Sequence, residues 1–362
     1  MIDGLDNLLE ESGQPGLIEL RQLLLEILGG TDTRGQVLDQ HRLPARRPRV
    51  YRLRFVIDGW IRSVIAKRME PAAAERNQLV INRWLPAIGL GDNGPILLGV
   101  SAGLNGQSVW HVYDDLGERA LDTSDPEGEH VRAAVALMAQ LHMRFTRHSL
   151  LAECRLHGGD LGINFYSANV RDAIGCLESL QTPAVALSAE RSALRERLLS
   201  RLRQLQNQQA VRAQVMAEFG GAETLLHGDL WTGNIFVLPA VHGVQARFID
   251  WDHTGVGPIS YDLSTFLLRF PIHERLTVLN LYRQAVRPAG WNPPSVRGLN
   301  LLFETAEFSR LANCIIWPAI ALAHDRIGWG FEELAHVDQW FENWKPVLPV
   351  EHESNTGNFV SS

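Results

Sequence analysis

Two short stretches of the sequence place polar side chains at the ends of apolar runs. LLHGDLWTGNIF (225–236) contains Asp229 and, five residues later, Asn234, and FIDWD (248–252) leads from an apolar run to Asp250. Polar groups are costly in such positions unless chemistry needs them. Transfer of a phosphoryl group from a nucleotide to a hydroxyl needs such a set, namely a carboxylate that accepts the hydroxyl proton and hard oxygen ligands for Mg²⁺.

The spacing of these residues predicts that they meet. A separation of five residues lets a tight loop aim Asp229 and Asn234 at one point. Residues 235–250 are expected to form a hairpin that turns near Gly243 and returns to Asp250. Two strands should therefore bring the three side chains to one site.

The elements that must position this site fall into two groups, of which the first is rich in strands. Apolar alternation and the turn signals Asp58-Gly59 and Asn105-Gly106 predict an antiparallel sheet, and Pro71 begins a helix within it. The expected strands cover residues 36–43, 49–57, 60–69, 96–102 and 108–115, and the helix covers residues 71–90.

The second group is mainly helical, with helical apolar spacing over 129–145 and 188–219 and again beyond residue 262. A further helix at 17–28 has the spacing of a packing or capping element. We therefore expect an α+β chain with a small antiparallel β N-lobe, which carries one main helix, and a larger, mostly helical C-lobe. The expected bounds are 1–35 for an N-terminal helical extension, 36–113 for the N-lobe, 114–350 for the C-lobe and 351–362 for a disordered tail.

The composition argues against several classes of protein. A formal net charge of −7 disfavours a nucleic-acid binder, which usually carries a basic face. No apolar stretch reaches the roughly 18 residues of a membrane span, and the three cysteines lie far apart, outside any CxxC pattern. We expect a soluble cytoplasmic protein, a monomer or a homodimer, without a nucleic-acid or membrane partner.

The motif residues resemble the catalytic signature of protein kinases. His227, Asp229 and Asn234 match the H-x-D-x-x-x-x-N loop, and Asp250 matches the metal-binding aspartate that opens D-F-G. The resemblance implies that Asp229 is the catalytic base, that Asn234 and Asp250 are the Mg²⁺ ligands, and that His227 supports the loop.

Two features separate the chain from the protein kinases themselves. Gly228 stands where many protein kinases have arginine, and the helix expected at 261–268 begins within ten residues of Asp252, which leaves no room for an activation segment. Together with P-x-x-Y-D-L-S (258–264), the motifs resemble the aminoglycoside phosphotransferase family of small-molecule kinases, over roughly residues 36–330. The resemblance implies a two-lobe, protein-kinase-like fold and an ATP- and Mg²⁺-dependent transfer to a hydroxyl of an aminoglycoside, an amino sugar or sugar, or an amino alcohol.

The resemblance also implies a lysine on the third strand that contacts the phosphates. Lys67 stands at the end of SVIAK and is one of only two lysines among 34 basic residues, so its choice over arginine is informative. Glu75 is the only acid in the helix at 71–90 and is the expected partner of Lys67, although Gln78 lies where related kinases could place the acid.

The nucleotide contacts of the N-lobe are less fully indicated. VWHVYDDLG (109–117) resembles the interlobe linker, where Asp114 and Leu116 are expected to contact the adenine; the alternative is a connector with adenine bound elsewhere. The loop at 41–50 contains no glycine, and its arginines either contact phosphates or are solvated. This departure from a glycine-rich loop keeps GTP open as an alternative to ATP.

Several side chains near the motif allow more than one role. Asp252 could touch a second Mg²⁺, the substrate or only the loop, and Trp231 could line the acceptor pocket or be buried. Asp262 resembles a structural acid that caps the next helix, and a contact with the substrate is the alternative. Acids of the C-terminal helices, such as Glu304 and Glu307, could bind an amine-bearing substrate or be solvated.

The leading prediction is thus a small-molecule kinase. A nucleotide-binding pseudokinase with a regulatory or scaffolding role is the alternative, favoured by the missing glycine-rich loop and disfavoured by the complete set of chemical groups. The sequence leaves the identity of the acceptor open, because fold does not determine function.

Overall fold

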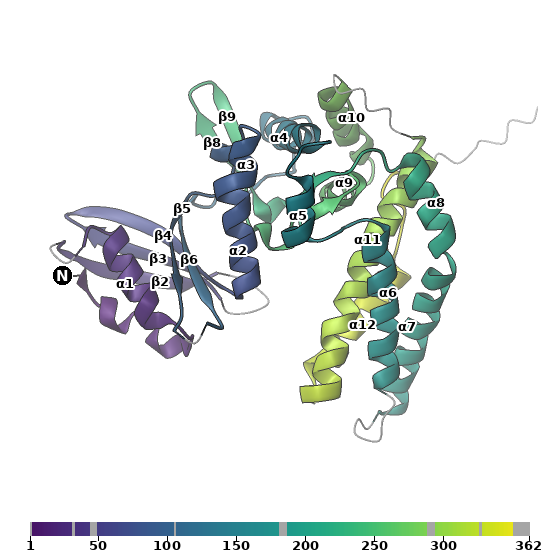
Figure 1. The fold of residues 1–362 in the computed structure, drawn as a ribbon, viewed down its shortest axis with the longest axis horizontal. Helices are drawn as coiled ribbons and strands as arrows, with labels where there is room; N and C mark the ends of the chain where they lie inside the picture. The colour runs from purple at the N-terminus through teal and green to yellow at the C-terminus, as the bar shows by residue number, and fades with distance from the viewer. Residues whose placement is uncertain are drawn as a thin grey trace, which may run out of the picture.

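The computed structural model describes residues 2–30, 33–43, 49–104, 106–180, 187–287, 294–325 and 328–349. The expected tail at 351–362 lies outside these ranges. The described residues form a mixed α+β structure of two lobes, a sheet lobe and a helical lobe, with α2 and α3 between them (Figure 1). The predicted fold class is confirmed.

The sheet lobe contains a six-stranded sheet in the order β1-β2-β3-β4-β6-β5, antiparallel except for the parallel pair β1 and β2. The strands are β1 (Ile2–Asp3), β2 (Gly35–Arg42), β3 (Val50–Ile57), β4 (Trp60–Met69), β5 (Leu97–Ala102) and β6 (Val109–Asp114). Five of them lie where alternation predicted strands. The sixth, β1, is too short to show alternation.

The hairpin between β3 and β4 shows why the sequence folds this way. Ile57 pairs with Trp60, so Asp58 and Gly59 form a two-residue turn, and both have positive φ (49° and 85°). Asp-Gly is well suited to such a turn, whose twist matches the twist of the strands. The turn sets the register of β4 and therefore the position of Lys67.

Each face of the sheet has its own partner. Helix α1 (Leu17–Ile27) lies against β5, and its Leu20 and Leu24 belong to one buried apolar cluster with Leu53 and Phe55 of β3. On β4, Lys67 alternates with Ala66, which belongs to this same core, so Lys67 lies on the opposite face, toward the helical lobe. The N-terminal segment thus packs directly on the sheet.

A continuous helical stretch joins the two lobes. Helix α2 (Pro71–Leu79) begins with proline in its first turn and passes through a π-helical turn at Val80–Trp84 into α3 (Leu85–Ala87). It matches the helix predicted at 71–90. Residues of α2 contact the turn at Trp251–His253, so the helix spans from the sheet to the motif region.

The helical lobe has one part around the motif strands and a second helical layer. Its strands are β7 (Thr224–Leu226), β8 (Ile235–Ala240), β9 (Gly243–Phe248) and β10 (Gly255–Gly257), and its helices near them are α4 (Glu129–Phe145), α5 (Leu151–Gly158), α9 (Ser260–Leu267) and α10 (Arg275–Val286). The second layer contains α6 (Ile163–Ser179), α7 (Ala189–Asn207), α8 (Gln209–Phe219), α11 (Val296–Ile320) and α12 (Trp329–Glu342), which run side by side in Figure 1. The hairpin β8–β9 is the one predicted at 235–250.

We expect the packing of α1 to contribute to the stability of the sheet lobe. Leu24 is fully buried, so Leu24→Ala should lower the free energy of unfolding by about 2–5 kcal/mol through lost burial and the cavity left behind. Ile18→Ala on the same helix is the matched control, because Ile18 is 78% exposed. Urea denaturation followed by circular dichroism measures both. Equal effects of the two substitutions would show that α1 does not pack as described.

Candidate functional site

The loop between β7 and β8 holds Asp229 and Asn234 together. Asn234 lies in a short 3-10 turn, and its Nδ2 donates to the backbone oxygen of Asp229 at 2.9 Å and to Oδ2 of Asp229 at 3.2 Å. Asn234 is buried, and Asp229 is half-buried. The amide therefore orients the carboxylate while its own Oδ1 stays available as a hard oxygen ligand.

The hairpin brings Asp250 to the same place. Ile235 pairs with Phe248, and the Ile249 amide donates to the backbone oxygen of Asn234 at 2.9 Å, so the return strand ends beside the loop. Asp250 has φ 64° and ψ 62°, a left-handed conformation that is uncommon for a residue with a side chain. Its side chain is 40% exposed, which leaves the carboxylate accessible to a ligand.

Lys67 connects this site to the sheet lobe. Its Nζ lies 2.6 Å from Oδ1 of Asp250 and 2.6 Å from Oδ1 of Asp252. Burial by itself lowers the pKa of Lys67, but the attraction of the two carboxylates outweighs it, and the pKa is raised above its ordinary value. The ammonium is therefore a permanent charge in the interior between the lobes.

Asp252 is the more enclosed of the two carboxylates. Besides Lys67 it accepts a hydrogen bond from Nδ2 of Asn77 at 2.9 Å, and Nη2 of Arg49 lies 3.6 Å from its Oδ2. Burial would raise the pKa of Asp252, but Lys67, Asn77 and Arg49 stabilise the charged form and lower it to about 2. Among the roles left open for Asp252, the structure shows contacts with the protein itself.

The structure does not bring Glu75 to Lys67. The Glu75 side chain is 65% exposed, and it lies 3.8 Å from His157. Its position on α2 points it away from the buried lysine, and Gln78 lies near His111 instead. The predicted Lys67–Glu75 pair is therefore wrong: at this point α2 contributes the side-chain amide of Asn77, which contacts Asp252 and not Lys67.

A buried acid fixes the backbone of the loop that contains Asp229. Asp262 of α9 accepts hydrogen bonds from the amides of His227 (2.7 Å) and Gly228 (2.9 Å), and His142 Nε2 lies 3.3 Å from it. Burial would raise the pKa of Asp262, but its partners, His142 first, lower it. Asp262 is structural as expected, but it binds the loop amides and does not cap α9, because the chain folds the loop onto the first turn of that helix.

The side chain of His227 also holds this loop in place, through both nitrogens of its ring. It is fully buried against Trp251 and Phe248, its Nε2 donates to the backbone oxygen of Ile249 at 2.8 Å, and its Nδ1 accepts from the amide of Asp229 at 3.3 Å. Burial lowers the pKa of the imidazole, which favours its neutral form. The ring therefore links the loop that contains Asp229 to the residue before Asp250.

The interlobe linker is fastened to β3. Arg52 Nε lies 2.8 Å from Oδ2 of Asp115, and Arg52 Nη2 donates to the backbone oxygen of Gly117 at 2.9 Å. The amide of Asp114 donates to the backbone oxygen of Ile96 at 2.9 Å, and Leu116 lies in the linker between the two lobes. The sequence did not indicate Arg52, because 32 of the 34 basic residues are arginines and nothing distinguishes this one from the others.

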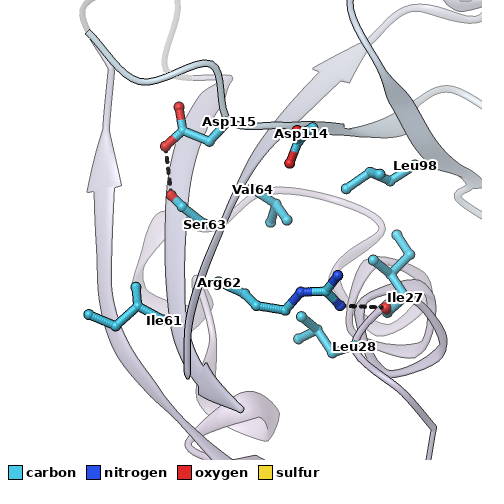
Figure 2. Close-up of a pocket in the computed structure, with 9 residues that line it drawn as sticks. All are labelled: Ile27, Leu28, Ile61, Arg62, Ser63, Val64, Leu98, Asp114 and Asp115. Atoms are coloured by element: carbon cyan, nitrogen blue, oxygen red, sulfur yellow. Dashed lines mark hydrogen bonds between the residues drawn. The ribbon is translucent and has the colours of Figure 1, made fainter. Parts of the chain in front are cut away.

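The side chain of Asp114 points into a cavity outside the motif site. Figure 2 shows this pocket of about 480 Å³ between the end of α1, β4, β5 and the start of the linker. Its lining residues are Ile27, Leu28, Ile61, Arg62, Ser63, Val64, Leu98, Asp114 and Asp115. None of them is a motif residue, so we do not assign the motif chemistry to this pocket.

Other candidates are partly settled by their contacts. Trp231 is 43% exposed, which excludes the buried alternative. Glu304 lies 3.0 Å from Arg212, and Glu307 is buried with Arg310 and accepts from Ser264 at 2.6 Å, so both acids are already paired. Of the arginines in the loop at 41–50, Arg46 and Arg47 lie outside the described residues.

Asp250 and Asn234 offer too few oxygen atoms to enclose a magnesium ion alone, but they fit one whose other ligands are water and phosphate oxygens. Among the described residues no cluster of three or more His, Cys, Asp or Glu side chains has the geometry of a metal site. Mg²⁺ is commonly held by one or two carboxylates, with water and phosphate oxygens completing its shell. Asp250 and the amide oxygen of Asn234 match such a partial set.

Comparisons with known proteins concern the family and the fold of the chain. The sequence model of the phosphotransferase enzyme family matches residues 40–299. A search of curated proteins gave no match. Within the described residues no helix is long and apolar enough to cross a membrane.

Solved structures of small-molecule kinases share the fold at low sequence identity. Ethanolamine kinase of Plasmodium vivax has a TM-score of 0.56 at 12% identity, covering 92% of each chain. A spectinomycin phosphotransferase solved with ADP and spectinomycin has a TM-score of 0.55 at 14% sequence identity, and the match covers 92% of this chain and 96% of that one. An aminoglycoside phosphotransferase of Streptomyces rimosus has a TM-score of 0.51 at 17% sequence identity, and the match covers 84% of this chain and 100% of that one.

Gly228→Ala should disrupt the loop. Gly228 has φ +83°, and a Cβ there would lie 1.9 Å from the backbone oxygen of His253. Because that backbone belongs to the segment after Asp250, the loop must move, and we expect a loss of about 3 kcal/mol or more in unfolding free energy. Gly243→Ala at the tip of the hairpin is the comparison, since there the close atom is the flexible end of Glu129. Similar losses in both variants would contradict the tight contact at Gly228.

Asp262→Asn should destabilise the protein in a pH-dependent way. Hydrogen bonds to a charged acceptor are worth about 1.5–3 kcal/mol each, and the variant loses the charge. Because the folded-state pKa of Asp262 is lowered, its contribution is complete above the ordinary pKa of about 4 and is lost as pH falls through the folded-state pKa. The difference between wild type and variant in urea denaturation should therefore shrink below about pH 4. A difference that stays constant with pH would refute this role.

Proposed function

The chain belongs to the phosphotransferase enzyme family, and from this premise we propose that it transfers the γ-phosphate of ATP to a hydroxyl group of a small molecule. One observation carries the proposal. Asn234 contacts Asp229, and Lys67 of the sheet lobe contacts Asp250 of the helical lobe. The two pairs are linked through the backbone, because the Ile249 amide donates to the backbone oxygen of Asn234. A carboxylate oriented by an asparagine side chain, a second accessible carboxylate and a buried ammonium are groups that this reaction needs.

We assign Asp229 as the catalytic base. Its carboxylate is held by Asn234, and its backbone follows amides that Asp262 fixes, so its position is determined before substrate arrives. A preorganised base accepts the acceptor proton without first having to reorient. Exposed Trp231, three residues before Asn234 in the same loop, is the candidate wall for the acceptor.

We assign Asn234 and Asp250 to Mg²⁺ and Lys67 to the phosphate chain. Bound Mg²⁺ would neutralise phosphate charge and orient the γ-phosphate for in-line attack. The 40% exposure of Asp250 leaves its carboxylate open to the cation, while Lys67 remains in the interior as a cation directed at the same point. Asp114 and Leu116 remain our candidates for adenine contacts, through the linker that Arg52 fastens. Glu75 is no longer among the nucleotide-binding candidates.

ATP is the proposed nucleotide, and GTP is the alternative that the test must include. The likeness to a spectinomycin phosphotransferase solved with ADP supports nucleotide binding at the level of the fold. The acceptor is proposed as a small molecule with a hydroxyl group, such as an aminoglycoside, an amino sugar or an amino alcohol. Because Glu304 and Glu307 are paired with arginines, an amine on the acceptor would be bound by other groups.

A protein-kinase activity is disfavoured by the path of the chain after Asp252. The backbone passes through the turn at Trp251–His253 directly into β10, which pairs with β7 and leads into α9 at Ser260. No segment is left between the metal loop and α9 to bind a protein substrate in the way that an activation segment does.

Asp229→Asn should slow phosphoryl transfer by about 10²–10⁴-fold while leaving nucleotide binding intact. Loss of a general base costs about 10²–10⁴ in rate, and Asp229 is not assigned to the nucleotide. The measurement is ATP and GTP consumption over a panel of hydroxyl compounds with Mg²⁺, with nucleotide affinity determined by calorimetry. Consumption at the wild-type rate in Asp229→Asn would contradict the assignment. Nucleotide binding by the wild type without consumption across the panel would favour a pseudokinase.

A further inference from the structure

The two carboxylates that contact Lys67 differ in how much of their surface is free. Asp250 is 40% exposed, whereas the Asp252 side chain is 10% exposed. Oδ1 of Asp252 accepts from both Lys67 and Asn77, and Oδ2 faces Arg49. Asp250 is therefore open to a ligand, while Asp252 is enclosed by Lys67, Asn77 and Arg49.

Helix α2 holds Asp252 and not Lys67. Asn77 is 1% exposed, and its Nδ2 is divided between Asp252 and the backbone oxygen of Ala73, which lies one turn earlier on the helix. Arg76 of the same helix donates to the backbone oxygen of Asp252 and to the backbone oxygen of His157. Both the carboxylate and the main chain of residue 252 are thus fixed by one helix turn.

The acid that pairs with the lysine comes from a different element here than in protein kinases. There, the lysine pairs with a glutamate of the N-lobe helix, which aligns it with the phosphates. Here the only acid of α2, Glu75, lies at the surface, and the buried carboxylate comes from the segment after β9. Helix α2 still contributes to the position of Lys67, but indirectly: the Asn77 amide binds Asp252, and Asp252 binds Lys67.

We propose that Asp252, held by Asn77, is the residue that positions Lys67 for the phosphate chain of the nucleotide. The inference rests on the proposed function. If Asp250 turns to Mg²⁺ when the nucleotide binds, Lys67 keeps one carboxylate partner, and that partner is Asp252. A buried ammonium without any partner is strongly unfavourable, so the residue that stays with it determines where it points. Asp252 is on this reading a positioning residue and not a ligand of a second metal ion.

The test compares ligands with and without phosphates. Asp252→Asn keeps the shape of the side chain but removes its charge, so the dissociation constant of Mg-ATP should rise by about tenfold or more. The dissociation constant of adenosine should stay unchanged, because adenosine has no phosphate for Lys67 to contact. Isothermal titration calorimetry on the full chain measures both ligands, and circular dichroism with thermal melting confirms that each variant is folded.

A charge swap separates positioning from a structural role. In Asp252→Asn with Asn77→Asp, the amide and the carboxylate exchange places across the same hydrogen bond, so one negative charge returns next to Lys67. We expect the double variant to bind Mg-ATP more tightly than Asp252→Asn alone. Asp39→Asn is the matched control, since Asp39 forms an exposed ion pair with Arg54 on the same sheet at 2.6 Å.

Three outcomes would overturn the inference. They are an unchanged Mg-ATP affinity in Asp252→Asn, an equal loss for Mg-ATP and adenosine, and a larger loss in Glu75→Gln than in Asp252→Asn. A wild-type protein that binds neither Mg-ATP nor Mg-GTP would instead contradict the proposed function, so the two failures are distinguishable.

Discussion

The arrangement of the molecule depends on the neutralisation of one buried cation. Lys67 is 6% exposed, and its charge is matched by two carboxylates that follow β9 in the other lobe. Because an unpaired ammonium in the interior is strongly unfavourable, the ion pairs specify how the sheet must face the motif loop. Helix α2 strengthens this contact by binding Asp252 through Asn77. The position of the lobes and the geometry of the site are therefore consequences of the same interaction.

A second buried charge, the carboxylate of Asp262, fixes the position of its neighbours inside the helical lobe. Asp262 is fully buried, and its carboxylate is compensated by two loop amides and His142. The supporting acids, Asp252 and Asp262, are enclosed by protein donors, whereas Asp229 and Asp250 remain accessible. Burial thus distinguishes the acids that support the site from those that can meet a ligand, which residue type alone does not.

The sequence predicted the parts of the site that lie within a short stretch of chain, and erred where a helix had to be oriented. The loop from Asp229 to Asn234 and the hairpin to Asp250 follow from spacing and turn residues. Glu75 was chosen as the only acid of its helix, but spacing does not say which side of α2 faces the other lobe. Asn77, two residues further on, faces it, and Glu75 faces solvent. The helix was predicted, while its rotation about its own axis was not.

The sequence by itself determined the strand alternation, the Asp58-Gly59 turn that sets the register of β4, and the motifs that identify the family. These depend on interactions between residues close along the chain, whose geometry is restricted by covalent connection. Only the tertiary structure decided that Lys67 meets Asp250 and Asp252, more than 180 residues away, and that Asp262 binds the loop before Asp229. Such partners are chosen by packing and by the neutralisation of buried charge, which depend on the folding of the whole chain.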